Sequence, residues 1–244
     1  MKIGIFDSGY GGLTILEKIR ARLPEYDYIG VARDDGKTKG EYSPVFYRRD
    51  RFELLDSGTF WLSETPDEVS YGWDADCRRV CSWGLFKDKL SKRKFWFFNT
   101  HMDHKGKAAR VEGAKLVISK IKSMCGDKAS VILTGDFNVA QNSPAYNTFA
   151  QSGILKDAYN LAPIKYAPAG TFNNFKVDTH TDKRIDHIFV KGFDVKRYGI
   201  LTYHYWSDEQ GSDSELNSAP TELTAEHRGV HLPSDHYPVQ IFVE

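Results

Sequence analysis

The succession of apolar and polar positions predicts a sheet-rich fold arranged around one buried strand. Residues 131–133 (Val-Ile-Leu) are apolar in a row, which is typical of a strand buried on both faces. Gly135 interrupts this run, and Asp136 and Asn138 follow one residue apart. Shorter apolar or alternating runs predict strands over 2–6, 28–32, 43–48, 52–60, 80–86, 95–99, 185–190, 198–206 and 236–243.

Two stretches have the spacing of a helix. Residues 108–124 place five apolar side chains on one face, and residues 13–23 repeat Leu and Ile at helical intervals before Pro24. The five side chains are Val111, Ala114, Val117, Ile118 and Ile121. Strands that outnumber helices favour two packed sheets with helices on their outer faces. The polar stretches are expected to be loops, over 33–41, 87–94, 141–178 and 207–233.

Composition excludes several classes of protein. A chain of 244 residues is long enough for one sizeable core, and we expect one domain over 1–244. Its net charge of zero provides no global attraction to nucleic acid or an anionic membrane. Cys77, Cys81 and Cys125 do not suggest a disulfide framework. Without a membrane span or a signal-peptide pattern at the start, we expect a cytoplasmic protein. We also expect a monomer.

Polar residues gather at the ends of four predicted strands, over 99–104, 134–138, 184–187 and 233–236. If these ends lie side by side, they form one patch of Asp, His and Asn side chains. An Asx turn that only closes the strand explains Asp136 and Asn138 equally well when that stretch is taken alone. Surface or core imidazoles are the preferred interpretation of His180, His204 and His227.

Such a patch is suited to metal-assisted phosphoryl hydrolysis. A divalent cation on carboxylate oxygens polarises a phosphate and neutralises developing charge. A His paired with an Asp transfers protons near neutral pH, with the Asp fixing its tautomer. An Asp beside an Asn orients and deprotonates the attacking water, while a second His stabilises the pentacovalent oxygen.

The segments NTHMDH, TGDFN, RIDHIFV and PSDHYPV resemble the endonuclease/exonuclease/phosphatase superfamily, from about residue 24 to the C-terminus. The resemblance implies a four-layer α/β-sandwich of two mixed sheets flanked by helices, with Mg²⁺ or Mn²⁺ as cofactor. It implies that His101 polarises the phosphate, Asp136 holds metal and activates water, and Asn138 binds phosphate. It also implies that His236, oriented by Asp186, acts on the phosphate and that Asp235 holds metal.

Three further residues have two interpretations each. Asp103 and His104 belong either to the pocket rim or to a loop cap. Arg79 precedes a strand near the site, and a plain surface Arg is preferred over a phosphate ligand. The exposed aromatic candidates for a pocket lining are Tyr166, Phe172, Phe175 and Trp206, although packing is the commoner role of such residues.

The N-terminal 28 residues depart from this family. The opening IGIFDSGYGGLT resembles glutamate racemase, where Asp7 and Ser8 match substrate-site residues. The superfamily's first strand, first helix and metal-binding Gln-Glu strand are missing, and Gly9-Tyr10 stands in the Gln-Glu place. We interpret the chain as a hybrid in which residues 1–28 are foreign. A strand over 2–6 and a helix would partly fill the gap. We expect the lost first strand to leave an unpaired edge in a sheet, and the lost Glu to weaken metal binding.

The leading hypothesis is a divalent-metal-dependent phosphoesterase, impaired by the lost Glu, that hydrolyses phosphodiesters or phosphomonoesters. Its substrate would be a phosphorylated small molecule, a nucleotide or a short nucleic acid. The first alternative is an inactive phosphate-binding protein that keeps His101, Asn138 and His236. The second is a glutamate racemase fragment, against which the absence of both catalytic-cysteine contexts counts.

Overall fold

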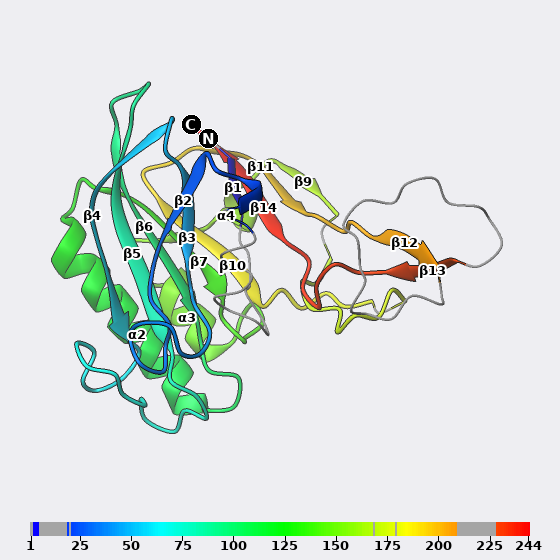
Figure 1. The fold of residues 1–244 in the computed structure, drawn as a ribbon. Helices are drawn as coiled ribbons and strands as arrows, with labels where there is room; N and C mark the ends of the chain where they lie inside the picture. The colour runs from blue at the N-terminus through cyan, green and yellow to red at the C-terminus, as the bar shows by residue number, and fades with distance from the viewer. Residues whose placement is uncertain (1, 5–18, 20, 168, 179, 209–227) are drawn as a thin grey trace.

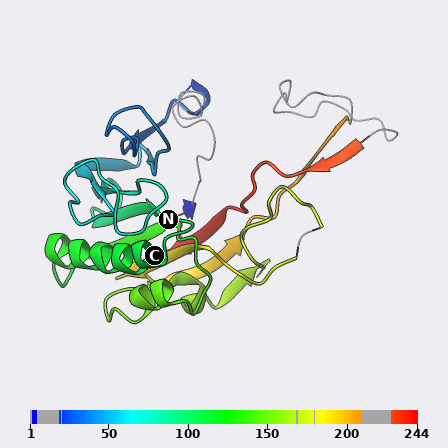
Figure 2. The same ribbon diagram turned by 90° about the horizontal axis from the view of Figure 1, so that it is seen from below.

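The computed structural model describes residues 2–4, 19, 21–167, 169–178, 180–208 and 228–244 (Figure 1). Two mixed β-sheets pack against each other, and helices α2 (Lys107–Cys125) and α3 (Pro144–Ala150) lie along one side of the larger sheet (Figure 2). This arrangement confirms the predicted α/β-sandwich. The helix expected over 13–23 lies outside the described residues except at 19 and 21–23, where 19, 21 and 22 are helical and Leu23 is not. None of the described helices has the length and apolarity needed to cross a membrane.

The larger sheet has six strands in the order β4-β5-β6-β7-β10-β8. Neighbours are antiparallel except β6 and β7, which run parallel because α2 provides the crossover between them. The central β7 is buried at every residue after Ser130, as its apolar run predicts. The strand bounds are β4 (Phe52–Trp61), β5 (Val80–Asp88), β6 (Lys94–His101), β7 (Ser130–Asp136), β8 (Lys156–Asp157) and β10 (Asp186–Lys191).

The smaller sheet has the order β1-β14-β11-β9, with bounds β1 (Lys2–Gly4), β9 (Ile164–Tyr166), β11 (Val195–Ile200) and β14 (Val239–Val243). β1 pairs antiparallel with β14, Ile3 standing opposite Ile241. The strand predicted over 2–6 is therefore present over 2–4. The expectation of an unpaired edge was wrong at these residues, because β14 has a partner on each side.

Two hydrophobic cores hold the layers together. One lies between the sheets and joins side chains such as Ile132 and Ile188 of the larger sheet to Ile200 and Ile241 of the smaller. The other lies between the larger sheet and the helices, where Val117 and Ile121 of α2 meet Leu133. Burial of these apolar side chains fixes the strands whose ends carry the candidate site.

Some predicted elements have different bounds. The predicted strand over 28–32 is β2 (Tyr26–Ile29), paired with β3 (Val45–Arg48). It ends before Gly30, whose φ of +116° is unsuited to a strand and where a Cβ would lie 2.7 Å from Ser82 Oγ.

The predicted strand over 198–206 was wrong as a single element. β11 ends at Ile200, and β12 (Tyr205–Asp208) pairs instead with β13 (Arg228–His231) in a two-stranded arm that projects from the body in Figure 1. β13 occupies part of the stretch expected to be a loop. The stretch 141–178 was also predicted as loop, but it contains α3, β8, α4 (Ala158–Leu161) and β9.

Candidate active site

Three strand ends bring their polar residues into one row across the larger sheet. In the parallel pair β6–β7, His101 stands opposite Asp136. In the antiparallel pair β7–β10, Asp186 stands opposite Asp136 from the other side. Residues directly opposite each other project from the same face of a sheet. The fourth segment reaches this row through the bridge between His236 and Phe172.

The side chains of this row meet. His101 Nε2 lies 3.3 Å from Asp136 Oδ2, and His236 Nε2 lies 3.9 Å from the same oxygen. His236 Nδ1 lies 2.8 Å from Asp186 Oδ2. Both carboxylates are buried and both imidazoles are partly buried. The structure therefore gathers four of the predicted site residues around the Asp136 carboxylate.

The two imidazoles have opposite electrostatic surroundings. Burial alone would lower the pKa of His236, but the hydrogen bond and negative charge of Asp186, helped by Asp136 and Asp235, raise it to about 9. Burial, reinforced by the positive charges of Arg79 and Arg33, holds the pKa of His101 well below its ordinary value. At neutral pH the site thus pairs a charged His236 with a neutral His101.

Asn138 follows the strand end in a turn that the structure retains. Its backbone N–H donates to Asp136 Oδ1 at 2.7 Å. This hydrogen bond forms the Asx turn that was one of the two interpretations of Asp136 and Asn138. Its side-chain amide donates to the Met102 carbonyl at 2.9 Å, and its φ is +50°. The two interpretations are therefore compatible, since the Asx turn holds the Asp136 carboxylate in the row of site residues.

Asp235 lies beside His236 and is half-buried. Its carbonyl accepts hydrogen bonds from the backbone N–H groups of Asn173 and Asn174, at 2.8 and 3.1 Å. These bonds tie the segment before β14 to the loop that carries Phe172.

Two residues that the sequence did not single out reach the site. Glu41 Oε2 lies 3.6 Å from His101 Nδ1 and accepts a 2.5 Å hydrogen bond from Arg33 Nη1. Both residues belong to the stretch predicted as an exposed charged loop, but only its tip is exposed. Charge patterning alone contains no signal for this fold-back, because Arg33 and Glu41 are eight residues apart and meet through the loop's own turn.

Arg79 is buried, so the expectation of a surface Arg was wrong. Its guanidinium lies 3.7 Å from Glu41, 3.5 Å from Asp103 and 3.1 Å from His104 Nδ1. Together with Arg33, Glu41 and His101 it lines a small hollow beside the row of site residues. Burial of a guanidinium requires acidic or polar partners, and Asp103 and Glu41 provide them.

Asp103 is a loop cap, the second of its two interpretations. Its carboxylate accepts from the backbone N–H groups of Cys77, Lys105 and Gly106. Burial acts to raise its pKa, but these backbone hydrogen bonds lower it to about 2. His104 is exposed, and its Nε2 lies 3.5 Å from Asp76 Oδ2, so its assignment to the pocket rim stays a prediction.

The donor set at the row suits a hard divalent cation. Asp136, Asp186 and His236 each offer a ligand atom within 4.8 Å of the others. Carboxylate oxygens are the ligands that Mg²⁺ and Mn²⁺ prefer. However, His236 and Asp186 are hydrogen-bonded to each other. The fit therefore rests on carboxylates, and Asp7, the acidic residue nearest in sequence to the place of the family's Glu, lies outside the described residues.

The remaining candidates divide by position. Phe172 is half-exposed, and its ring centre lies 5.1 Å from that of His236, so it borders the site. Phe175, Tyr166 and Trp206 are exposed, the last two on β9 and β12. His180 and His204 are exposed, and His227 and Ser8 lie outside the described residues. All three cysteines are free, with Cys81 in the core.

Comparison with known proteins agrees with this geometry. The model of the endonuclease/exonuclease/phosphatase family matches residues 123–236. A crystal structure of a protein of this family from Bacteroides thetaiotaomicron is 49% identical, with a TM-score of 0.85, over 93% of this chain and 78% of that chain. A mannosyl-6-phosphatase from the same organism is 48% identical, with a TM-score of 0.84, over 94% of this chain and 80% of that chain.

The likeness to racemases is partial. Glutamate racemase of Pseudomonas aeruginosa is 44% identical over 62 residues, which cover 25% of this chain and 22% of the racemase. By the extent of its likeness, the chain belongs to the endonuclease/exonuclease/phosphatase family, whose members are hydrolases acting on phosphoesters.

Proposed function

We propose that this chain is a divalent-metal-dependent phosphoesterase that removes phosphate from a phosphorylated sugar. The observation that carries the proposal is the convergence of His101, Asp136, Asp186 and His236. Asp136 lies 3.3 Å from His101 and 3.9 Å from His236, and Asp186 lies 2.8 Å from His236. Side chains from four distant segments do not meet in this way for packing alone, because two buried carboxylates are costly to desolvate.

Mg²⁺ or Mn²⁺ would be held by Asp136 together with Asp235 or Asp186. When bound, such an ion polarises the phosphate and neutralises the charge that develops on its oxygens. The resemblance places Gly9-Tyr10 where the family has Gln-Glu, so we expect weaker metal binding than in a site that includes a Glu. Isothermal titration with Mn²⁺ tests this, and tight binding would refute it.

The protein groups divide the work by their protonation. His236, charged at neutral pH, donates from Nε2 to a phosphate oxygen while Asp186 holds its Nδ1 proton. His101, kept neutral, contacts a second phosphate oxygen. Asp136 orients the attacking water and accepts its proton, and Asn138 binds phosphate. These roles correspond to positioning and charge stabilisation of a phosphoryl group in line with its nucleophile.

A sugar phosphate is favoured over nucleic acid for three reasons. The chain is 48% identical to a mannosyl-6-phosphatase over four-fifths of that protein. Its net charge of zero provides no global attraction for a polynucleotide backbone. Half-exposed Phe172 at the edge of the site provides an apolar face for a sugar ring.

The test is phosphate release from mannose 6-phosphate and glucose 6-phosphate, and release of the aryl alcohol from an aryl phosphodiester, with Mg²⁺, with Mn²⁺ and with a chelator. We expect metal-dependent release from a hexose 6-phosphate that is lost in Asp136→Ala and His236→Ala and kept in Asp194→Ala, at an exposed position. Activity unchanged by the first two substitutions would remove the mechanism. Phosphate binding without turnover at high Mn²⁺ would identify the catalytically inactive alternative instead.

A further inference from the structure

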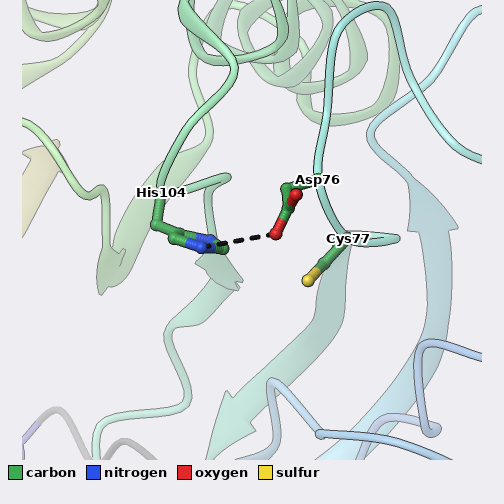
Figure 3. A group of neighbouring side chains, drawn as sticks. All are labelled: Asp76, Cys77 and His104. Carbon is green, nitrogen blue, oxygen red and sulfur yellow. Dashed lines mark ion pairs between the residues drawn. The ribbon is translucent and has the colours of Figure 1, made fainter.

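A second group of metal-ligating side chains lies outside the row of site residues. Asp76 and Cys77 precede β5, and His104 follows β6. Figure 3 shows their carboxylate, thiol and imidazole facing one another from two chain segments. One ligand atom from each lies within 4.8 Å of the other two, and His104 Nε2 is 3.5 Å from Asp76 Oδ2.

Hydrogen bonds to two neighbouring carboxylates, Asp103 and Asp74, hold the backbone of this group in place. The buried Asp103 carboxylate accepts from Cys77 N at 3.2 Å, Lys105 N at 3.0 Å and Gly106 N at 2.7 Å. It therefore joins the segment that carries Asp76 and Cys77 to the segment that carries His104. Asp74 adds a second tie, since its carboxylate accepts from Ala109 N at 2.7 Å in the first turn of α2. Such support from neighbouring hydrogen bonds is what orients ligands before a metal binds.

The ligand chemistry differs from that of the active site. A thiolate, an imidazole and a carboxylate form a borderline-soft set that favours Zn²⁺ over Mg²⁺. Tetrahedral zinc, with bonds of roughly 2.0–2.3 Å, keeps its ligand atoms about 3.3–3.8 Å apart. The Asp76–His104 distance of 3.5 Å already lies in that range. The thiol lies within 4.8 Å of both other ligand atoms, so a shift of at most about 1 Å would complete three protein ligands and leave a fourth position for water.

Two cations now contact the group and would compete with a metal. Lys105 Nζ lies 3.0 Å from Asp76 Oδ2, but this lysine is largely exposed and free to swing away. Arg79 donates to His104 Nδ1 at 3.1 Å, which places the proton of a neutral imidazole on Nε2. Metal binding at Nε2 therefore needs the other neutral tautomer, in which the proton has moved to Nδ1 and the Arg79 hydrogen bond is given up, and the ring releases no proton. Binding at Cys77 displaces the thiol proton, so one proton is released to solvent per metal bound.

We propose that Asp76, Cys77 and His104 form a second metal site, selective for Zn²⁺ and similar thiophilic divalent ions, on the rim of the active site. Of the three cysteines, Cys77 alone belongs to a group of this kind among the described residues. The proposal does not depend on the phosphoesterase activity, because it concerns binding by a separate set of side chains.

The test is titration of the full chain with Co²⁺ in excess Mg²⁺, which keeps the hard carboxylates occupied. We expect one equivalent of Co²⁺ to produce a thiolate-to-cobalt charge-transfer band in the near ultraviolet, and Zn²⁺ to abolish it. Cys77→Ser should remove the band, whereas Cys125→Ser, at the other half-buried cysteine, should keep it. His104→Gln and Asp76→Asn should each weaken Co²⁺ binding about tenfold or more.

Circular dichroism of each variant confirms that a lost band reflects a lost ligand. A folded wild-type chain that develops no band at millimolar Co²⁺ would overturn the proposal. A band that survives in Cys77→Ser and disappears in Cys125→Ser would overturn it equally, since the thiolate would then lie at the end of α2.

Discussion

His236 Nδ1 and Asp186 Oδ2 share a 2.8 Å hydrogen bond between residues 50 apart in sequence. This bond and the charge of Asp186 are the main causes that raise the pKa of His236 to about 9, against the effect of burial. Asp186→Asn should therefore lower this pKa towards or below its ordinary value of 6.5. NMR titration of the imidazole signals in the metal-free protein measures the change.

The same substitution should lower kcat at neutral pH by roughly a hundredfold, because His236 then loses its proton near the assay pH. Asp194→Asn is the control, since Asp194 stands just before β11, is exposed, and its carboxylate forms a surface ion pair with Lys196. A His236 pKa that remains near 9 in Asp186→Asn would show that another group holds the proton.

Asp103 predicts an acid-sensitive contribution to stability. Its pKa is about 2 in the folded chain against an ordinary 3.8, so its contribution is complete above about pH 4 and is lost as the pH falls through 2. The shift corresponds to about 2 kcal/mol. Asp103→Asn should lower the free energy of unfolding by at least that amount at pH 6, with a gap that narrows in acid.

Urea unfolding of wild type and variant between pH 6 and pH 2.5 measures this gap. Asp127→Asn, at an exposed position, is expected to change stability little at any pH. A gap for Asp103→Asn that stays constant down to pH 2.5 would contradict the expected titration.

Gly135 sets the approach of β7 to β6 just before the site. A Cβ on Gly135 would lie 1.9 Å from the Thr100 carbonyl oxygen, and φ is +153°. Gly135→Ala must push the two strands apart, so we expect roughly 3 kcal/mol or more of destabilisation together with lost activity. In Gly113→Ala, on α2, the Cβ meets its neighbours at an ordinary 3.5 Å. That variant should be neutral or stabilised by up to about 1 kcal/mol. Thermal unfolding compares them, and similar melting temperatures would contradict this account.

Two substitutions at Asn138 separate the effect of backbone strain on stability from that of its side-chain hydrogen bond. Both Asn138→Ala and Asn138→Gly lose the 2.9 Å bond to the Met102 carbonyl, but only Gly adopts the φ of +50° without cost. We expect Asn138→Ala to be less stable than Asn138→Gly by about 1 kcal/mol in urea unfolding. Both should weaken phosphate as a product inhibitor if Asn138 binds it. Equal stabilities would show that the turn relaxes around Ala.

The central elements could be predicted because their local pattern and their burial agree. The apolar run over 131–133 forms the buried β7, and the helical spacing over 108–124 forms α2 over Lys107–Cys125. The four polar strand ends were recognisable because an ordinary core strand has no reason to end in carboxylates and imidazoles. Parallel pairing of β6 with β7 then aligned His101 with Asp136.

The remaining elements and site residues could not be predicted, either because a signal in the sequence was outweighed by its neighbours or because the hydrophobic pattern contains no such signal. Ser143-Pro144 is a helix start, with Ser143 Oγ accepting from Tyr146 N, yet the surrounding polar residues favoured a loop. Between Ile200 and Tyr205 the chain leaves one sheet for another, and apolar residues on both sides concealed the break. Glu41 and Arg79 reach the site through tertiary contacts between distant loops, which no periodicity reports.

The pairing of Lys2–Gly4 with β14 has a consequence for how this architecture tolerates replacement of a segment. Strand addition relies on main-chain amides and carbonyls, which every residue except proline supplies in the same geometry. If residues 1–28 are foreign, as we interpret them, pairing through the main chain would let Lys2–Gly4 dock against Val239–Val243 without matching the residues it replaced. Catalytic carboxylates have no such interchangeability, so grafting of this kind preserves architecture more readily than chemistry.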